Sequence, residues 1–217
     1  MRVTRTTRWT LVSGLLFVAL YVIATIPNAQ VGFLSATDEV AGFIESSAGR
    51  LQTSGYLGVL SAFFLLWFVG AVRSSLVSAQ ARAGVLTDTA FAGGVAASVV
   101  VASFLTGVRA LAQRAGSDVP IGPDAMTGLY HSAMQLSSLA LPVTLAVFVG
   151  GAGVALSMTR LLPRWFGWLS AVVALALLLP EAQMFMPVGL LWIVVVSVWL
   201  LATAGRMAVE ATPEPIS

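Results

Sequence analysis

The feature that most constrains this chain is a series of apolar runs separated by short polar segments. The runs occupy residues 9–27, 55–73, 88–109, 130–158, 165–180 and 187–205. An α-helix needs roughly 20 apolar residues to cross the hydrocarbon core of a bilayer. A helix also satisfies its own backbone hydrogen bonds in lipid. The pattern therefore predicts an all-α, polytopic membrane helix bundle with six transmembrane helices, the fifth of them short.

The composition supports a membrane environment. Hydrophobic residues make up 58% of the 217-residue chain and charged residues only 9%, whereas soluble domains carry about 25% charged residues. So few charges cannot cover a soluble surface of this size. We expect a single six-helix transmembrane domain over residues 1–208 and a disordered cytoplasmic tail over residues 209–217.

The distribution of arginines predicts the orientation. With the N-terminus in the cytoplasm, eight arginines fall inside and three outside, which follows the positive-inside rule. We therefore expect a multi-pass membrane protein with both termini cytoplasmic. The inside set is Arg2, Arg5, Arg8, Arg73, Arg82, Arg160, Arg164 and Arg206, and the outside set is Arg50, Arg109 and Arg114.

The segment between the first two runs is more than a linker. Asp38 and Glu39 suit the first turn of a helix, and Val40, Phe43 and Ile44 fall at the i, i+3, i+4 spacing of one apolar stripe. This pattern predicts a short amphipathic helix that lies on the outer surface or caps the bundle.

Several kinds of chemistry lack the residues they need. The chain has no Cys and no Lys, which excludes thiol catalysis and a Schiff base on lysine. Its single histidine excludes a His-rich metal site. We expect no cofactor and no metal, and the scattered arginines give no support for a nucleic-acid partner.

Glu181 is the first candidate for a catalytic residue. It lies between Pro180 and the last apolar run, at the expected outer edge of the membrane. Loss of hydration there would favour a neutral acid that can donate or relay a proton. The alternative is a wet hairpin turn. His131 is the second candidate, as a proton carrier near the top of the fourth span, or else as a hydrogen-bonded interfacial histidine.

Three further residues are candidates for substrate binding. Trp192 and Phe185 lie near Glu181 in the sequence, and Arg109 lies near the outer end of the third span. Aromatic faces can bind a cationic centre, and a buried arginine paired with a carboxylate in a membrane indicates function. The alternatives are aromatic packing and an arginine that extends to the membrane surface.

Small residues recur in the third and fourth spans, at Gly93 and Ala97 and again at Gly151 and Ala155. This spacing allows two helix backbones to approach closely. It predicts packing within the chain or, alternatively, a homodimer face.

Two stretches carry a resemblance to a known group of proteins. They are "ATDEVAGFIESSAGRLQTSGYLGVLSAFFLLWFVGAVR", residues 36–73, and "LPRWFGWLSAVVALALLLP", residues 162–180. Both resemble uncharacterised six-helix integral membrane proteins of GC-rich bacteria. The resemblance implies the fold and a location in the bacterial inner (cytoplasmic) membrane, and it implies no activity or functional residue.

Three functions remain open at this point. The first is a small accessory or regulatory membrane subunit that binds a membrane protein partner. The second is a membrane-embedded enzyme that acts on a lipid or isoprenoid, with terpenoid-cyclase-like acid catalysis by Glu181. The third is a small proton-coupled transporter. The position of Glu181 discriminates among them, because the first requires it in water and the second in a closed outer pocket.

Overall fold

Every regular element in the described part of the chain is a helix, which confirms the all-α prediction. The computed structural model describes the backbone of residues 5–30, 37–79, 84–115, 117 and 122–210, and the side chains of these residues except 5–11, 29–30 and 204–210. The elements are α1 (Arg5–Thr25), the 3₁₀-helix η1 (Ile26–Gln30), α2 (Thr37–Ser46), α3 (Ala48–Ala79), α4 (Gly84–Ala115), α5 (Pro123–Gln135), the π-helix η3 (Leu136–Ala140), α6 (Leu141–Met158), α7 (Arg164–Leu177) and α8 (Ala182–Glu210).

Four helical stretches are long and apolar enough to cross a membrane. They are α3, α4, the continuous α5–η3–α6 stretch (Pro123–Met158, hereafter the α5–α6 helix) and the Ala182–Thr203 part of α8. The two other apolar stretches, Val12–Asn28 and α7, are shorter. Each predicted run thus contains a helix, but length and composition support four crossings, not the predicted six.

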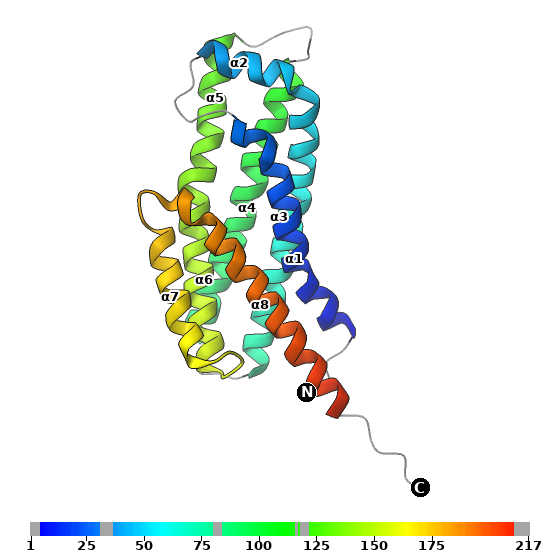
Figure 1. Ribbon diagram of the computed structural model, residues 1–217, viewed down its shortest axis with the longest axis vertical. Coiled ribbons are helices and arrows are strands. Elements are labelled where there is room, and N and C mark those ends of the chain that lie inside the picture. The colour runs from blue at the N-terminus through cyan, green and yellow to red at the C-terminus, as the bar shows by residue number, and fades with distance from the viewer. Residues whose placement is uncertain (1–4, 31–36, 80–83, 116, 118–121, 211–217) are drawn as a thin grey trace.

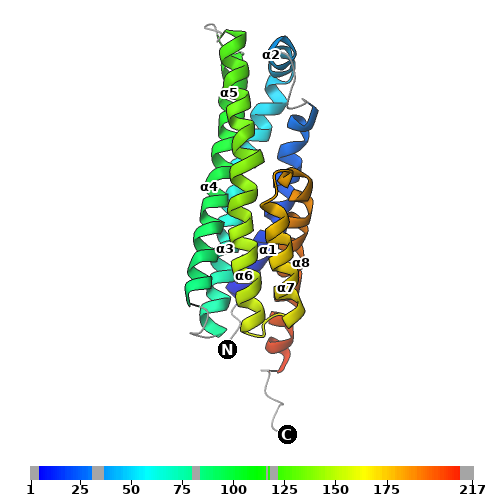
Figure 2. The same ribbon diagram turned by 90° about the vertical axis from the view of Figure 1, so that its left-hand side faces the viewer.

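The long helices lie side by side along the long axis of the molecule (Figure 1). Helix α4 packs between α3 and the α6 part of the α5–α6 helix, and α1 packs against α3 and α8. Helix α8 crosses the bundle obliquely, and α7 packs against α6 and α8 (Figures 1 and 2). Helices α1, α7 and α8 therefore form one side of the bundle, and α3, α4 and the α5–α6 helix form the other.

At one end the long helices form a cap with α2 (Figure 2). Val40, Ala41 and Ile44 of α2 are buried, and Asp38 and Glu39 occupy its first turn. The hydroxyl of Thr127 in α5 donates a hydrogen bond to the carbonyl oxygen of Thr37, at 3.3 Å. The predicted amphipathic capping helix is confirmed, with Ala41 in the place of Phe43 on the buried face.

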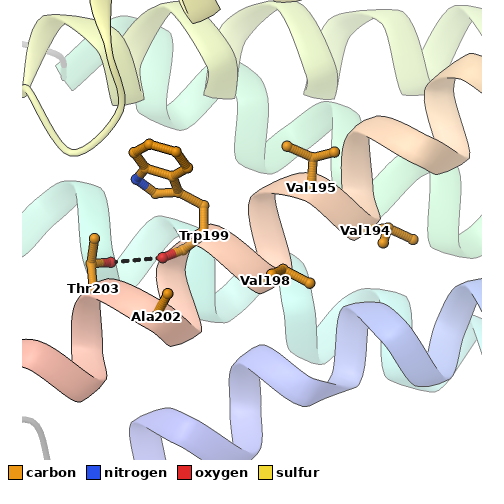
Figure 3. Close-up of a pocket in the computed structure, with 6 residues that line it drawn as sticks. All are labelled: Val194, Val195, Val198, Trp199, Ala202 and Thr203. Carbon is orange, nitrogen blue, oxygen red and sulfur yellow. Dashed lines mark hydrogen bonds between the residues drawn. The ribbon is translucent and has the colours of Figure 1, made fainter.

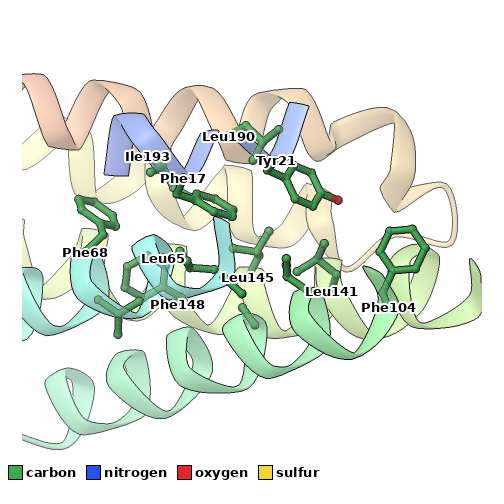
Figure 4. Packing of buried hydrophobic residues seen from close by; sticks show 14 of the residues in the cluster. Phe17, Tyr21, Leu65, Phe68, Phe104, Leu141, Leu145, Phe148, Leu190 and Ile193 are labelled. Atoms are coloured by element: carbon green, nitrogen blue, oxygen red, sulfur yellow. The ribbon is translucent and has the colours of Figure 1, made fainter. Parts of the chain in front are cut away.

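The core is filled by interlocking aromatic and aliphatic side chains (Figure 4). Phe68 of α3 meets Phe148 of α6 edge to face, with 6.1 Å between the ring centroids. Phe148 in turn meets Trp192 of α8 at 5.8 Å. These edge-to-face contacts are favourable aromatic geometries, and they join α3 and α6 to α8.

Small residues bring α4 and α6 together, as one of the two alternatives predicted. A Cβ atom at Gly93 would lie 2.7 Å from Cγ1 of Val147 and 2.9 Å from the amide nitrogen of Phe148. A Cβ atom at Gly151 would lie 3.0 Å from Cβ of Ala90. Packing within the chain thus accounts for both glycines.

Two predicted boundaries differ from the structure. Helix α8 begins at Ala182, so Pro187 lies inside the helix and not at its start. Proline removes one backbone hydrogen bond. Near a helix end, groups on neighbouring helices can satisfy the freed carbonyl more easily than in the middle of the helix. Helix α8 also continues to Glu210, past the predicted boundary at 208. The predicted disordered tail falls mainly on residues 211–217, outside the described residues.

We expect Gly93→Val to destabilise the bundle. The added side chain would overlap the α6 backbone, which cannot move aside as a flexible side chain can. Overpacking of this kind costs about 1–3 kcal/mol. The measurement is the midpoint of thermal unfolding in detergent. Gly70→Val in α3 is the control, because a Cβ atom there meets nothing within 4 Å. Equal midpoints for the two variants would contradict the proposed close contact.

Candidate functional site

The main candidate site is a cleft of about 600 Å³ on the side of the bundle formed by α1, α7 and α8. It lies where α1 ends and α8 begins, against the α5–α6 helix. Figure 4 shows three of its residues, Tyr21, Phe104 and Leu190, near the same end of the core. The described lining consists of Tyr21, Val22, Thr25, Ile26, Asn28, Phe104, Met134, Ser137, Gln183, Met186, Pro187 and Leu190.

The end of α1 forms one wall of the cleft. The hydroxyl of Thr25 donates to the carbonyl oxygen of Tyr21 at 3.0 Å. The side-chain amide of Asn28 donates to the carbonyl oxygen of Ala24 at 3.4 Å, and the hydroxyl of Ser54 in α3 donates to the same oxygen. Side chains therefore satisfy carbonyls that the ending helix leaves without backbone donors.

A π-helical turn forms the opposite wall. Residues 136–140 adopt this wider turn. Pro142 follows after Leu141, has no backbone N–H and cannot donate to the carbonyl of Ser138. The turn carries Ser137, which lines the cleft together with Tyr21. Single π-helical turns inside longer helices occur frequently at functional sites.

The N-terminal part of α8 closes the third side. Pro187 cannot donate to the carbonyl of Gln183, and both residues line the cleft. Prolines thus interrupt backbone hydrogen bonding on two neighbouring helices next to the same cavity. A backbone carbonyl that loses its N–H donor needs another donor in lipid. The cleft is therefore a place where a ligand can supply hydrogen bonds.

The polar groups of the cleft are neutral. Its described lining contains no carboxylate, histidine or arginine. Asn28 is only 7% exposed, and its side-chain oxygen accepts no hydrogen bond from the described residues. A buried amide oxygen without a donor is costly. The arrangement is suited to hold a neutral polar group by hydrogen bonds while Met134, Met186 and Leu190 contact apolar chains.

Glu181 lies outside the described lining of this cleft. It is exposed in the turn between α7 and α8, and its carbonyl oxygen accepts a hydrogen bond from the amide of Met184 at 3.0 Å. Its carboxylate forms no ion pair with a described residue. This position is that of a residue that begins a helix, where a carboxylate interacts favourably with the helix dipole.

The structure does not bring His131 next to Glu181. His131 is half-buried in α5, on the side of the cap, and its ring lies 6.3 Å from the ring of Tyr130. Glu181 lies much lower, at the turn between α7 and α8 (Figure 1). The two predicted catalytic residues therefore do not form one acid–base pair.

The predicted substrate-binding residues are also dispersed. Trp192 is 3% exposed and its indole N–H donates to the hydroxyl of Ser170 at 2.8 Å. Phe185 packs against the hydrophobic core and is absent from the described lining of the cleft. Arg109 is half-buried in α4, where its Cβ contacts the backbone at Gly55 of α3. It forms no ion pair with Asp38 or Glu181, while Asp118 lies outside the described residues.

Sequence reasoning did not single out Tyr21, Asn28 or Ser137. Two signals were available. Asn28 follows Pro27 at the end of the first run, where an amide is costly in lipid. Pro142 in the middle of the fourth run indicates a local break in the helix, and Ser137 lies just before it.

The chain matches no protein-family model, and no curated protein or solved structure matches it either. The resemblance to six-helix bacterial membrane proteins therefore stays a prediction.

We expect Ser170→Ala to destabilise the protein, because it leaves the indole N–H of Trp192 buried without an acceptor. Such a loss costs about 1–3 kcal/mol. Trp192→Phe removes the donor, and the double variant should lose less than the sum of the two single changes. Unfolding in mixed micelles gives the three free energies. Strict additivity would show that the hydrogen bond does not stabilise the packing of α7 on α8.

Proposed function

We propose that the chain is an integral membrane protein of the accessory or regulatory type, which holds a neutral lipid or isoprenoid in the cleft between α1, α8 and the α5–α6 helix. The observation that carries this proposal is the lining itself. Neutral hydrogen-bonding groups from Tyr21, Asn28 and Ser137 meet apolar side chains in one cavity of about 600 Å³. Ligand sites are commonly apolar cavities with a few convergent polar groups.

The proposal includes six membrane crossings. Helix α1 has 21 residues, about 32 Å at 1.5 Å per residue, but its first turn carries Arg5 and Arg8, so its apolar part crosses a core of about 30 Å only with these arginines at the headgroups. Helix α7 has 14 residues, or about 21 Å, so it crosses only if it stands nearly upright with its ends close to the headgroups. The exposed Trp165 and Trp168 at its start suit an interface.

Charge supports the proposed orientation. More arginines lie toward the end of the bundle where α1 begins and α8 ends than toward the cap (Figure 1). The first set is Arg5, Arg8, Arg73, Arg160, Arg164 and Arg206, and the second is Arg50, Arg109 and Arg114. Asp38, Glu45 and Asp124 lie in the cap at the opposite end. The positive-inside rule then places both termini in the cytoplasm and the cap outside. In a bacterial inner membrane the cap would contact an outer partner and the cleft would open toward the outer leaflet.

The position of Glu181 favours this function over the two alternatives. Acid catalysis on a lipid requires the carboxylate to face the bound substrate, and Glu181 lies in an exposed turn outside the described lining. A transporter built from two inverted halves needs matching helices. Helices α3 and α7 would correspond in such halves, and they have 32 and 14 residues.

We expect a neutral amphiphile to bind in the cleft. The probe is a diacylglycerol with a photoreactive diazirine next to its glycerol group, added to the protein in nanodiscs. Phosphatidylglycerol with the same diazirine is the charged reference. Mapping of the crosslinked peptides by mass spectrometry should place the diacylglycerol on the C-terminal end of α1 and the N-terminal end of α8. The uncharged head should give the stronger labelling there, because the described lining offers no cation.

Met186→Trp should reduce this labelling about tenfold, which corresponds to about 1.4 kcal/mol of binding free energy. The larger side chain fills part of the cavity that Met186 lines. Val172→Trp is the matched control, because Val172 is 61% exposed on α7 and lies outside the described lining. Equal labelling of all three proteins, or stronger labelling by phosphatidylglycerol, would overturn the proposed ligand class.

A further inference from the structure

A second site lies at the opposite end of the bundle, where the loop between α6 and α7 meets α8. The indole N–H of Trp199 in α8 donates to the carbonyl oxygen of Leu161 in this loop, at 3.1 Å. Figure 3 shows the indole pointing from α8 toward that loop. The hydrogen bond attaches the loop to α8 and fixes the separation between the loop and the helix.

The loop holds two arginines in defined positions. Arg160 has φ of 58°, a left-handed conformation that disfavours any side chain. It ends α6 with a hydrogen bond from its amide to the carbonyl oxygen of Ser157 at 3.2 Å, and the amide of Leu162 donates to Leu156 at 3.1 Å. Arg164 follows four residues later, at the first position of α7. The loop backbone therefore presents both side chains near Trp199.

The two arginines border a hollow of about 600 Å³, together with Trp199 and Thr203 of α8. Both side chains are exposed, and neither guanidinium group forms an ion pair or a hydrogen bond with a described residue. By contrast, Arg73 at the same end of the bundle pairs with Asp88 at 3.3 Å. The described lining of the hollow contains no carboxylate. Its charge is thus positive and available to an anion.

An apolar groove continues from this hollow along α8. It has a volume of about 400 Å³, and Trp199 and Thr203 line both cavities. Its other described residues are Val194, Val195, Val198 and Ala202 (Figure 3). A cationic hollow and an apolar groove that share two residues match a molecule with an anionic head and a hydrocarbon chain.

We propose that the α6–α7 loop and the C-terminal half of α8 form a binding site for an anionic phospholipid. The guanidinium groups of Arg160 and Arg164 bind the phosphate, since planar guanidinium groups form strong, charge-assisted hydrogen bonds with phosphate oxygens. One acyl chain lies along Val194 and Val198. Trp199 lies at the junction, where tryptophan prefers to be in a membrane. The site is independent of the outer cleft, whose described lining is neutral.

The test compares phosphatidylglycerol with phosphatidylcholine of the same acyl chains, by native mass spectrometry of the full chain. We expect phosphatidylglycerol to bind about tenfold more tightly, the change that about 1.4 kcal/mol produces. Glycerol phosphate, which has the head and no chains, distinguishes a lipid site from a simple phosphate site. It should not displace the bound phosphatidylglycerol at equal concentration, and displacement would overturn the lipid assignment.

The test variant is the double change Arg160→Gly with Arg164→Gln. Glycine adopts a positive φ without strain, so the loop should fold at least as well while both charges are lost. We expect the preference for phosphatidylglycerol to disappear. The control is Arg50→Gln with Arg114→Gln, which removes the same net charge at the cap end and should leave the preference unchanged. Retention of the preference in the test variant, or its equal loss in both, would overturn the site.

Discussion

Helix length relative to bilayer thickness is the constraint on which the other features of this structure depend. Helices α3 and α4 have 32 residues each and the α5–α6 helix has 36, about 48 to 54 Å at 1.5 Å per residue. A hydrocarbon core is only about 30 Å thick. In the proposed membrane arrangement the excess emerges at one end, where α2 packs with the buried side chains of Val40 and Ile44. The proposed arrangement thus explains the cap as the part of three long helices that continues past the membrane.

The cleft arises from the same difference in length. Helix α1 ends at Thr25 and α8 begins at Ala182, beside long helices that continue. A short helix that ends next to a longer one leaves both an opening and carbonyls without donors. Ser54 and Asn28 donate to one such carbonyl on α1, that of Ala24. The facing α5–α6 helix widens there into the π-helical turn. At the other end, the attachment of the α6–α7 loop to Trp199 produces the hollow that holds two arginines.

Much of the fold could be predicted from hydropathy, because the six apolar runs and the stripe on α2 are local patterns. The glycine contacts of Gly93 and Gly151 also follow from a local spacing. The site could not be predicted in the same way. Trp192 lies near Glu181 in the sequence, yet the packing of α8 on α7 turns it toward Ser170, 22 positions away. Tyr21 and Ser137 line the same cleft from distant parts of the chain, and no periodic pattern indicates the π-helical turn that carries Ser137.

The most direct test of this account is the location of the cap relative to the membrane. The chain has no cysteine, so single cysteines can be introduced without background at Glu45 and Ala125 in the cap and at Ser78 near the other end of α3, all exposed. A membrane-impermeant maleimide should label the two cap positions in intact spheroplasts and Ser78→Cys only after permeabilisation. Labelling of Ser78→Cys together with the cap positions in intact spheroplasts, or protection of the cap in both conditions, would contradict a bundle whose long helices cross the membrane and emerge as a cap.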